Sequence, residues 1–135
     1  RMKWMLDTNT CIALIRTAPA STVRKLRGKS MGQVGLSSIV LSELAFGAAR
    51  SSRPAQNVAA LHEFLLALEV APYDHTAALQ YGAVRASLER KGRPIGPLDT
   101  LIAAHALALD VTLVTHNTRE FERVKGLRVE DWLKG

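Results

Sequence analysis

The sequence predicts one α/β domain, spanning residues 1–135, with a mainly parallel central sheet flanked by helices. Short apolar runs that lack polar alternation, as in residues 4–6, suit strands covered on both faces. These runs alternate along the chain with longer segments that carry helix periodicity and capping residues. A length of 135 residues suits one domain with its own core, and no repeat or linker divides it.

Composition and charge restrict the class of protein. The chain is 47% hydrophobic, so it is expected to fold, and its 18 basic and 12 acidic side chains give a net charge of +6. Such an excess favours a polyanionic partner, most commonly nucleic acid, although a basic protein without that role is equally compatible with charge alone. Cys11 is the only cysteine, which excludes an intrachain disulfide and a cysteine-rich zinc site.

The cellular setting is expected to be the cytoplasm. A lone cysteine fits a reducing compartment, and the apolar runs are far shorter than the roughly 18 residues of a membrane span. The first residues also lack the apolar core of a signal peptide, because Asp7 interrupts them. We therefore expect no membrane association.

The first strand is expected at residues 3–7 and runs directly into a carboxylate. Asp7 stands where this strand would end, and open α/β sheets bind their ligands at the carboxyl ends of strands. Thr8 and Asn9 are turn and cap residues, and a helix is expected over about 9–17. The alternative for Asp7 alone is a helix N-cap with no further role.

Capping and breaking residues place the later elements. Ser37 or Ser38 is expected to cap a helix, Pro54 and Pro97 to open helices, Asp74 to cap the longest helix and Gly92 to end it. Further strands are expected at 34–37, 70–73, 111–115 and 127–129, with 70–73 at an edge because it contains Pro72. Helices are expected at 39–50, 55–68, 74–91 and 98–109, with a short basic helix after residue 23 and a helical turn at 118–123.

Three carboxylates share one context and are candidates for chemistry. Asp7 ends the first strand, Glu43 lies early in the helix after the second strand, and Asp99 lies in the first turn after the loop 92–97. A parallel sheet would deliver all three to one edge. Clustered carboxylates repel one another unless a cation is present, so they indicate a site for Mg²⁺ or Mn²⁺.

A fourth polar segment follows the strand at 111–115. Thr115 and Asn117 fall at or just beyond its end, and Glu120 lies about one helical turn further on. The alternative is a capped strand-to-helix turn. Taken singly, Glu43 also fits a surface glutamate and Asp99 a helix N-terminal carboxylate, so only the set as a whole indicates a site.

Together these segments resemble the PIN-domain nucleases, and among them the VapC toxins of bacterial toxin–antitoxin pairs. The matching blocks cover nearly the whole chain in order: MLDTN at 5–9, SSIVLSELAFG at 37–47, GRPIGPLDTLIAAHA at 92–106, VTHNTREF at 114–121 and GLRVEDW at 126–132. The resemblance implies a PIN fold, an endoribonuclease that depends on Mg²⁺ or Mn²⁺, a cognate VapB-type antitoxin and a homodimer.

The resemblance also implies roles for particular residues. Asp7, Glu43 and Asp99 match the family's three main acids and are expected to hold the metal. The family often has a fourth acid where this chain has Asn117, so either that amide or Glu120 would complete the site. Water is expected to attack phosphorus, which leaves 5′-phosphate and 3′-hydroxyl ends.

The RNA substrate is expected to be a tRNA. The blocks at 92–106 and 126–132 resemble the enteric VapC branch, whose members cut initiator tRNA in the anticodon stem-loop. Polar side chains beside the acids are expected to contact RNA: Thr8, Asn9, Arg93, Thr115 and Arg119. Arg16, Arg24 and Arg27 are further candidates for phosphate contacts, and the alternative for each is an ordinary surface charge.

Two other classes of function compete with a nuclease. Aspartate-nucleophile phosphatases also place an aspartate after the first strand, but they need a second aspartate where this chain has Asn9. A non-catalytic module that binds RNA or a partner would not gather carboxylates where phosphate must dock. The Leu- and Ala-rich faces of 55–68 and 74–88 fit a dimer or antitoxin groove, with core packing as the default expectation.

Overall fold

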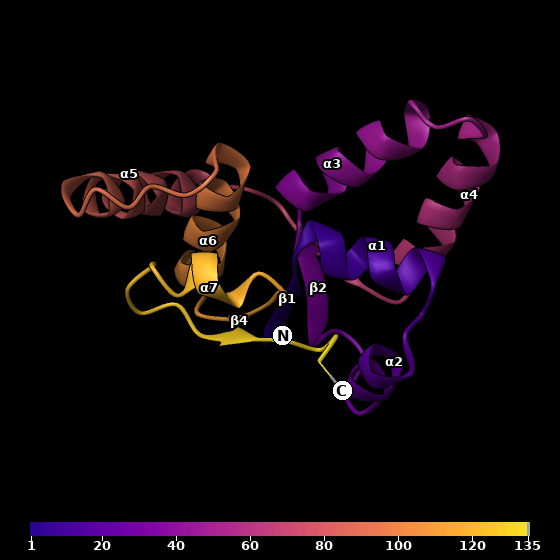
Figure 1. Ribbon diagram of the computed structural model, residues 1–135. Coiled ribbons are helices and arrows are strands. Elements are labelled where there is room, and N and C mark those ends of the chain that lie inside the picture. Colours follow the sequence, from indigo (N-terminus) through magenta and orange to yellow (C-terminus); the bar gives the residue numbers. More distant parts are fainter. Residues whose placement is uncertain (135) are drawn as a thin grey trace.

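A five-stranded parallel sheet forms the centre of the protein, as the computed structural model shows for residues 1–134 (Figure 1). The strand order is β3-β2-β1-β4-β5, and each pair of neighbouring strands is parallel. The strands are β1 (Trp4–Leu6), β2 (Val34–Ser37), β3 (Glu69–Ala71), β4 (Thr112–Val114) and β5 (Val129–Glu130). The predicted α/β class with a mainly parallel sheet is therefore confirmed.

Seven helices connect and flank these strands in the described part of the chain. They are α1 (Thr8–Arg16), α2 (Ala20–Arg27), α3 (Ser38–Ala49), α4 (Pro54–Leu65), α5 (His75–Arg90), α6 (Pro97–Leu109) and α7 (Thr118–Phe121). Helix α6 is the most buried, because Ile102, Ala103, Ala104 and Ala106 are all enclosed in the core. A helix that is apolar on all sides is expected in such a position.

The register of the sheet brings the ends of the strands to one edge. Leu6 of β1 lies opposite Val114 of β4, and the Asp7 N–H donates to the Val114 carbonyl at 3.0 Å. Since the strands are parallel, the residues that follow β1, β2 and β4 emerge on the same side of the sheet. The buried side chains of Met5, Leu36 and Leu113 hold these three strands together from within the core.

Most of the predicted caps are confirmed. The Asp74 carboxylate accepts from Ala77 N at 3.0 Å, and Pro54 and Pro97 occupy the first turns of α4 and α6. Ser37, not Ser38, caps α3, since its hydroxyl accepts from Ile39 N at 3.0 Å. Gly92 adopts a φ of +66°, the left-handed conformation that glycine tolerates best just after a helix.

Several boundaries differ from the sequence prediction. Strand β3 begins at Glu69 and ends before Pro72, because proline has no N–H to donate to the neighbouring strand. Its edge position is as predicted. Helix α4 ends at Leu65 rather than at 68, and β5 comprises Val129–Glu130 rather than 127–129. The short basic helix begins earlier than expected, directly after Pro19.

The expected core packing of the apolar faces of α4 and α5 is confirmed for one face of each helix. Leu61 of α4 and Val84 and Leu88 of α5 are buried in the core. Other apolar side chains of these helices stay exposed, and Val58 of α4 is 37% exposed. Helix α5 packs on α6 and projects beyond the sheet, so Leu79 is 67% exposed (Figure 1). Cys11 does pack in the core as predicted. Among residues 1–134, no helix combines the length and apolar character that a membrane span requires.

A substitution of Gly35 tests the close approach of β2 and β3. A β-carbon at this position would clash with the Glu69 carbonyl oxygen and the Met2 side chain, and the backbone atom cannot move without disturbing the sheet. Gly35→Ala is therefore expected to lower the free energy of unfolding by about 2–3 kcal/mol in urea denaturation.

The matched control is Gly82→Ala in α5. A β-carbon there has no neighbour within 4 Å, and alanine favours a helix over glycine. This variant should gain up to about 1 kcal/mol. Equal stability of the two variants would contradict the close approach.

Candidate functional site

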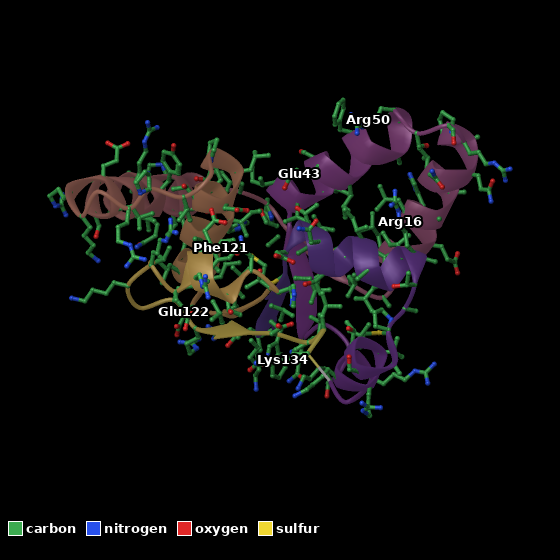
Figure 2. All side chains as sticks on the ribbon, viewed as in Figure 1. Arg16, Glu43, Arg50, Phe121, Glu122 and Lys134 are labelled. Carbon is green, nitrogen blue, oxygen red and sulfur yellow. The ribbon has the colours of Figure 1, made fainter. Side chains whose placement is uncertain are left out.

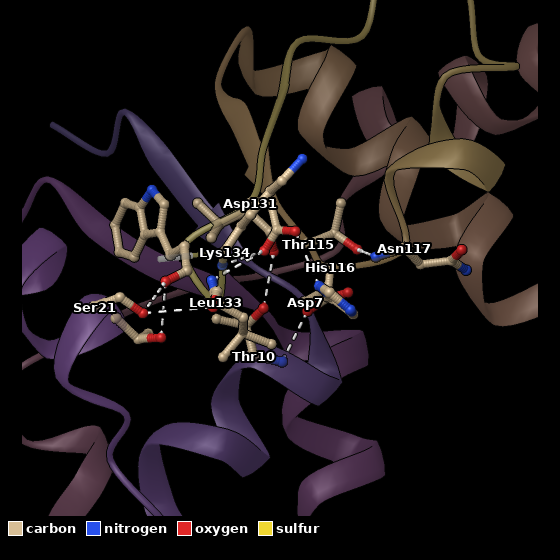
Figure 3. A network of polar contacts seen from close by, with 12 residues as sticks. Asp7, Thr10, Ser21, Thr115, His116, Asn117, Asp131, Leu133 and Lys134 are labelled. Atoms are coloured by element: carbon tan, nitrogen blue, oxygen red, sulfur yellow. Dashed lines mark hydrogen bonds and ion pairs between the residues drawn. The ribbon is translucent and has the colours of Figure 1, made fainter.

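Asp7 connects β1 to α1 and belongs to both. Its Oδ1 accepts from Thr10 N at 2.9 Å and so caps α1, while the residue is only 6% exposed (Figure 3). The cap uses one carboxylate oxygen and leaves Oδ2 without a hydrogen bond among the described residues. Asp7 is thus an N-cap, as the simpler interpretation held, and it also retains a free ligand atom at the sheet edge.

Glu43 reaches the same edge from α3. The Thr8 hydroxyl donates to Glu43 Oε1 at 2.6 Å, which joins residues that are 35 positions apart. Figure 2 shows Glu43 near the start of α3, beside the first turn of α1. Thr8, which the sequence predicts to contact RNA, thus has a hydrogen-bond partner within the protein. This bond fixes one oxygen of Glu43.

Asp99 shows that the acids interact. It lies in the first turn of α6, where Pro97 opens the helix. Burial, followed by the negative charges of Glu120, Asp7 and Glu43 in that order, raises the pKa of its carboxyl to about 6. Asp99 therefore lies in the field of all three other acids, and its charged form is disfavoured without a cation.

Glu120 is held at this edge by two neighbours. Its Oε1 accepts from Gly96 N at 3.0 Å, and its Oε2 accepts from the Asn117 side-chain amide. The glutamate thus ties α7 to the loop that precedes Asp99. Of the two candidates for completing the acidic set, the structure brings Glu120 next to Asp99, while Asn117 holds Glu120 in place.

Thr115 shapes the turn after β4. It is fully buried, and its hydroxyl accepts from Asn117 N at 3.0 Å (Figure 3). The other candidates for RNA contact are Asn9, Arg93 and Arg119. Each is exposed and lies within a few residues of one of the acids in the sequence, and its contact with RNA remains a prediction. Their exposure leaves their side chains free to meet a ligand.

Sequence reasoning missed a hydrogen bond beneath the site. His105 Nδ1 and the Ser37 hydroxyl are 2.8 Å apart, which links α6 to the residue that caps α3. Burial lowers the pKa of His105, so the ring is neutral at neutral pH. The bond helps to fix α3, which carries Glu43, relative to α6, which carries Asp99. No local pattern announces it, because the partners are 68 positions apart.

The donor set fits a hard divalent cation. The oxygens of Asp7, Glu43 and Asp99 are of the type that Mg²⁺ and Mn²⁺ prefer. Burial and repulsion from the other acids raise the pKa of Asp99, and such an ion would favour its charged form. Within residues 1–134, no three acidic, histidine or cysteine side chains already stand in metal-ligand geometry. The acids thus lie at one edge of the sheet, but among residues 1–134 they are not arranged around a single metal position.

Comparisons with known proteins show the family to which this fold belongs. The model of the PIN domain family matches residues 4–127. The tRNA(fMet)-specific endonuclease VapC of Shigella flexneri is 48% identical over 97% of this chain and 98% of its own length. The protein of the same name from Salmonella typhimurium is 46% identical over the same shares.

Solved structures show the same architecture. VapBC2 from Rickettsia felis, bound to a DNA fragment from their promoter, matches with a TM-score of 0.92 and 40% identity over 97% of this chain and 99% of that one. DNA-bound VapBC from Salmonella typhimurium matches with a TM-score of 0.92 and 45% identity over 98% and 99%. VapBC-1 from nontypeable Haemophilus influenzae matches at 0.89 and 34% over 98% and 100%.

A parallel α/β sheet with acids at its carboxyl edge is the arrangement of a PIN-domain nuclease. The chain belongs to the PIN-domain family and, within it, to the VapC ribonucleases. It is therefore an enzyme of the nuclease class rather than an aspartate-nucleophile phosphatase or a non-catalytic RNA-binding module.

The raised pKa of Asp99 predicts that the stability of the protein depends on pH. The pKa is about 6 in the folded protein and 3.8 in a model carboxyl, so the folded state binds more protons between these values. Stability should therefore fall as pH rises from about 4 to about 6 and remain reduced above that. Asp99→Asn should raise the free energy of unfolding at pH 7 by about 1 kcal/mol, allowing for solvent screening, and have little effect near pH 4.

Urea denaturation in EDTA at the two pH values measures this difference. The exposed Glu122 provides a matched control, because Glu122→Gln removes the same charge outside the acid cluster. A destabilised Asp99→Asn variant at pH 7 would contradict the clustering of the acids.

Proposed function

We propose that the chain is the toxin of a VapBC-type pair, an endoribonuclease that cuts tRNA and is neutralised by a VapB-type antitoxin. The observation that carries this proposal is that Asp7, Glu43 and Glu120 lie close enough to Asp99 for their negative charges to raise its pKa. Two relatives at 48% and 46% identity are named tRNA(fMet)-specific endonucleases, which makes initiator tRNA the leading substrate. The cytoplasm, where tRNA resides, is the proposed compartment.

Asp7, Asp99 and Glu43 would hold Mg²⁺ or Mn²⁺. Such an ion supplies positive charge that stabilises the phosphoryl oxygens and makes water a better nucleophile. The hydrogen bond from Thr8 fixes Glu43 Oε1, and the bond from Gly96 N fixes Glu120 Oε1 beside Asp99. These bonds hold the carboxylates in place before substrate arrives, so that less of the binding energy is spent on ordering them.

Exposed basic side chains around the acids would hold the RNA backbone. Arg93 lies in the loop 92–97, which Glu120 holds through Gly96 N, and Arg119 lies in α7 next to Glu120. Single-stranded loops suit such a site, because their backbone can be splayed into it. Water, rather than the ribose 2′-hydroxyl, would attack phosphorus and leave 5′-phosphate and 3′-hydroxyl ends.

Removal of either central aspartate is expected to abolish cleavage. Asp7→Ala and Asp99→Ala should reduce the rate of initiator-tRNA cleavage by at least about 10³-fold, and EDTA should stop the wild-type enzyme. Mapping new 5′ ends in tRNA, with and without Mg²⁺, measures this. The control Asp110→Ala removes an exposed carboxylate that pairs with Arg128 instead. Normal cleavage by either variant, or cleavage that survives complete chelation, would refute the proposed site.

A groove beside Glu43 is the proposed binding site of the antitoxin. It has a volume of 280 Å³ and lies between α1, α3 and α4, with an apolar floor that includes Ile12, Ile15 and Leu61. Arg16 and Arg50 flank it, and Glu43 forms part of its wall (Figure 2). Apolar side chains of an antitoxin segment would fill the groove, and acidic ones would pair with Arg16 and Arg50. The bound segment would lie beside Glu43 and so would block the approach of RNA to the acids.

Charge introduced into the groove is expected to weaken neutralisation. Ala60 lines the groove and is exposed, so Ala60→Glu adds a carboxylate without emptying the core. The Kd of the antitoxin should rise at least about tenfold, because a charge would be buried without a partner. Ala59→Glu is the control, since Ala59 is its exposed neighbour on α4 and does not line the groove. Equal antitoxin affinity of the two variants, measured by calorimetry, would place the partner elsewhere.

A homodimer is also proposed. The exposed part of α5 around Leu79, together with the neighbouring alanines, offers an apolar face that the rest of the described chain does not cover. Exposed apolar surface of this kind marks association sites in soluble proteins.

A further inference from the structure

The positive charge of the protein is concentrated in one segment. Residues 8–42 contain five of the eighteen basic side chains and none of the twelve acids, so this stretch carries five of the six net positive charges. The rest of the chain is close to neutral. A concentrated charge of one sign creates a local field that attracts ligands of the opposite sign.

Helix α2 holds most of this charge on the surface. Arg24, Lys25 and Arg27 are exposed, and Arg24 and Arg27 lie three positions apart, on adjacent sites of one helix face. Within residues 1–134, the ion pairs do not involve α2. The helix dipole favours basic side chains in the last turn of α2, and repulsion between like charges at this spacing offsets part of that gain. The helix therefore tolerates the cluster, and its charges stay available to a ligand.

The cluster lines an open hollow. A depression of 560 Å³ is lined by Arg24 and Arg27 together with Ala18, Ala20 and Val23. Small side chains beside the arginines leave room for a backbone to approach. The hollow lacks a large aromatic or aliphatic side chain of the kind that anchors a protein partner. Nucleic-acid interfaces are instead polar and strongly positive.

The segment around Trp132 holds α2 in place. The Thr22 hydroxyl donates to the Trp132 carbonyl at 2.9 Å. The Ser21 hydroxyl donates to the same oxygen at 3.2 Å, and Ser21 lies beside Leu133 (Figure 3). The Lys29 ammonium lies 4.2 Å from the centre of the Trp4 ring and 5.7 Å from that of Trp132. These contacts fix the helix relative to the sheet, so its charges need little ordering when a ligand binds.

The cluster stands apart from the acidic edge. Helix α1 starts beside Asp7, contains nine residues and so spans about 13 Å before the turn that leads to α2. Figure 1 shows α2 at the opposite end of the sheet from the start of α3. A short RNA lying over the acids would not cover α2, whereas a folded tRNA extends well beyond the bond that is cut.

We propose that α2 binds the phosphate backbone of the tRNA at a part of the molecule away from the cleaved loop. This proposal rests on the proposed tRNA substrate. Arg24, Lys25 and Arg27 form a second contact that selects a folded tRNA over a short single strand, because only the former reaches both the acids and α2. The contact adds affinity and leaves the chemical step unchanged.

The experiment compares two triple variants of equal charge. Arg24→Gln/Lys25→Gln/Arg27→Gln removes the cluster, and Arg53→Gln/Arg90→Gln/Lys125→Gln removes three exposed charges that are scattered over the surface. Glutamine keeps a good helix propensity, so α2 should persist. The Kd of initiator tRNA and of a short single-stranded oligonucleotide with its anticodon-loop sequence is measured in EDTA over a range of salt.

The cluster variant should bind the tRNA about tenfold more weakly than wild type at physiological salt, and its salt dependence should fall by about two to three units of slope. Its affinity for the oligonucleotide should match that of the scattered control. If α2 unfolds in the triple variant, Arg24→Gln alone should still lower the slope for tRNA by about one unit.

Equal tRNA affinity of the two triple variants would overturn the proposal. So would a loss confined to antitoxin binding, which would make the cluster a protein contact. A different result would show that the proposed function is wrong. The wild-type protein would then not cut tRNA when Mg²⁺ is added, whatever the binding results.

Discussion

Repulsion between carboxylates at one edge of the sheet is the constraint on which this structure depends. Burial and the negative charges of Glu120, Asp7 and Glu43 together raise the pKa of Asp99 to about 6. A fold selected only for stability would disperse such charges, because each shift in pKa represents free energy lost at neutral pH. A divalent cation would relieve the repulsion, and its binding would then couple the stability of the chain to the proposed nuclease site.

The rest of the fold brings the acids together and keeps them in place. Parallel pairing of β1 with β4 puts Asp7 beside the segment that leads to Glu120, and the buried bond between His105 and Ser37 fixes α6 against α3. The bond from Thr8 then fixes Glu43. Two other surfaces accompany this edge: the apolar groove between α1, α3 and α4, which shares Glu43 with it, and the basic cluster on α2, which stands apart from it. An inhibitor and a large substrate can thus act on the site from different directions.

Much of this arrangement is encoded locally and could be read from the sequence. The unbroken apolar run before Asp7, the serine before α3 and the proline before Asp99 each identify an element and its end. The contacts that act over long sequence separations could not be read, as between Glu120 and the Gly96 N–H. The sequence also did not show that Leu79 of α5 stays exposed while Val84 and Leu88 pack in the core, because helical periodicity shows that a face is apolar and does not show what covers it.

Diffraction from crystals containing Mn²⁺ tests the central claim most directly. Anomalous scattering identifies the ion independently of any activity, and its position can be compared with the carboxylates of Asp7 and Asp99. The account predicts a peak between these two side chains in the wild-type protein, lost in crystals of Asp99→Asn. A wild-type structure in which Mn²⁺ binds elsewhere, or in which these acids remain apart without an ion at high Mn²⁺ concentration, would contradict it.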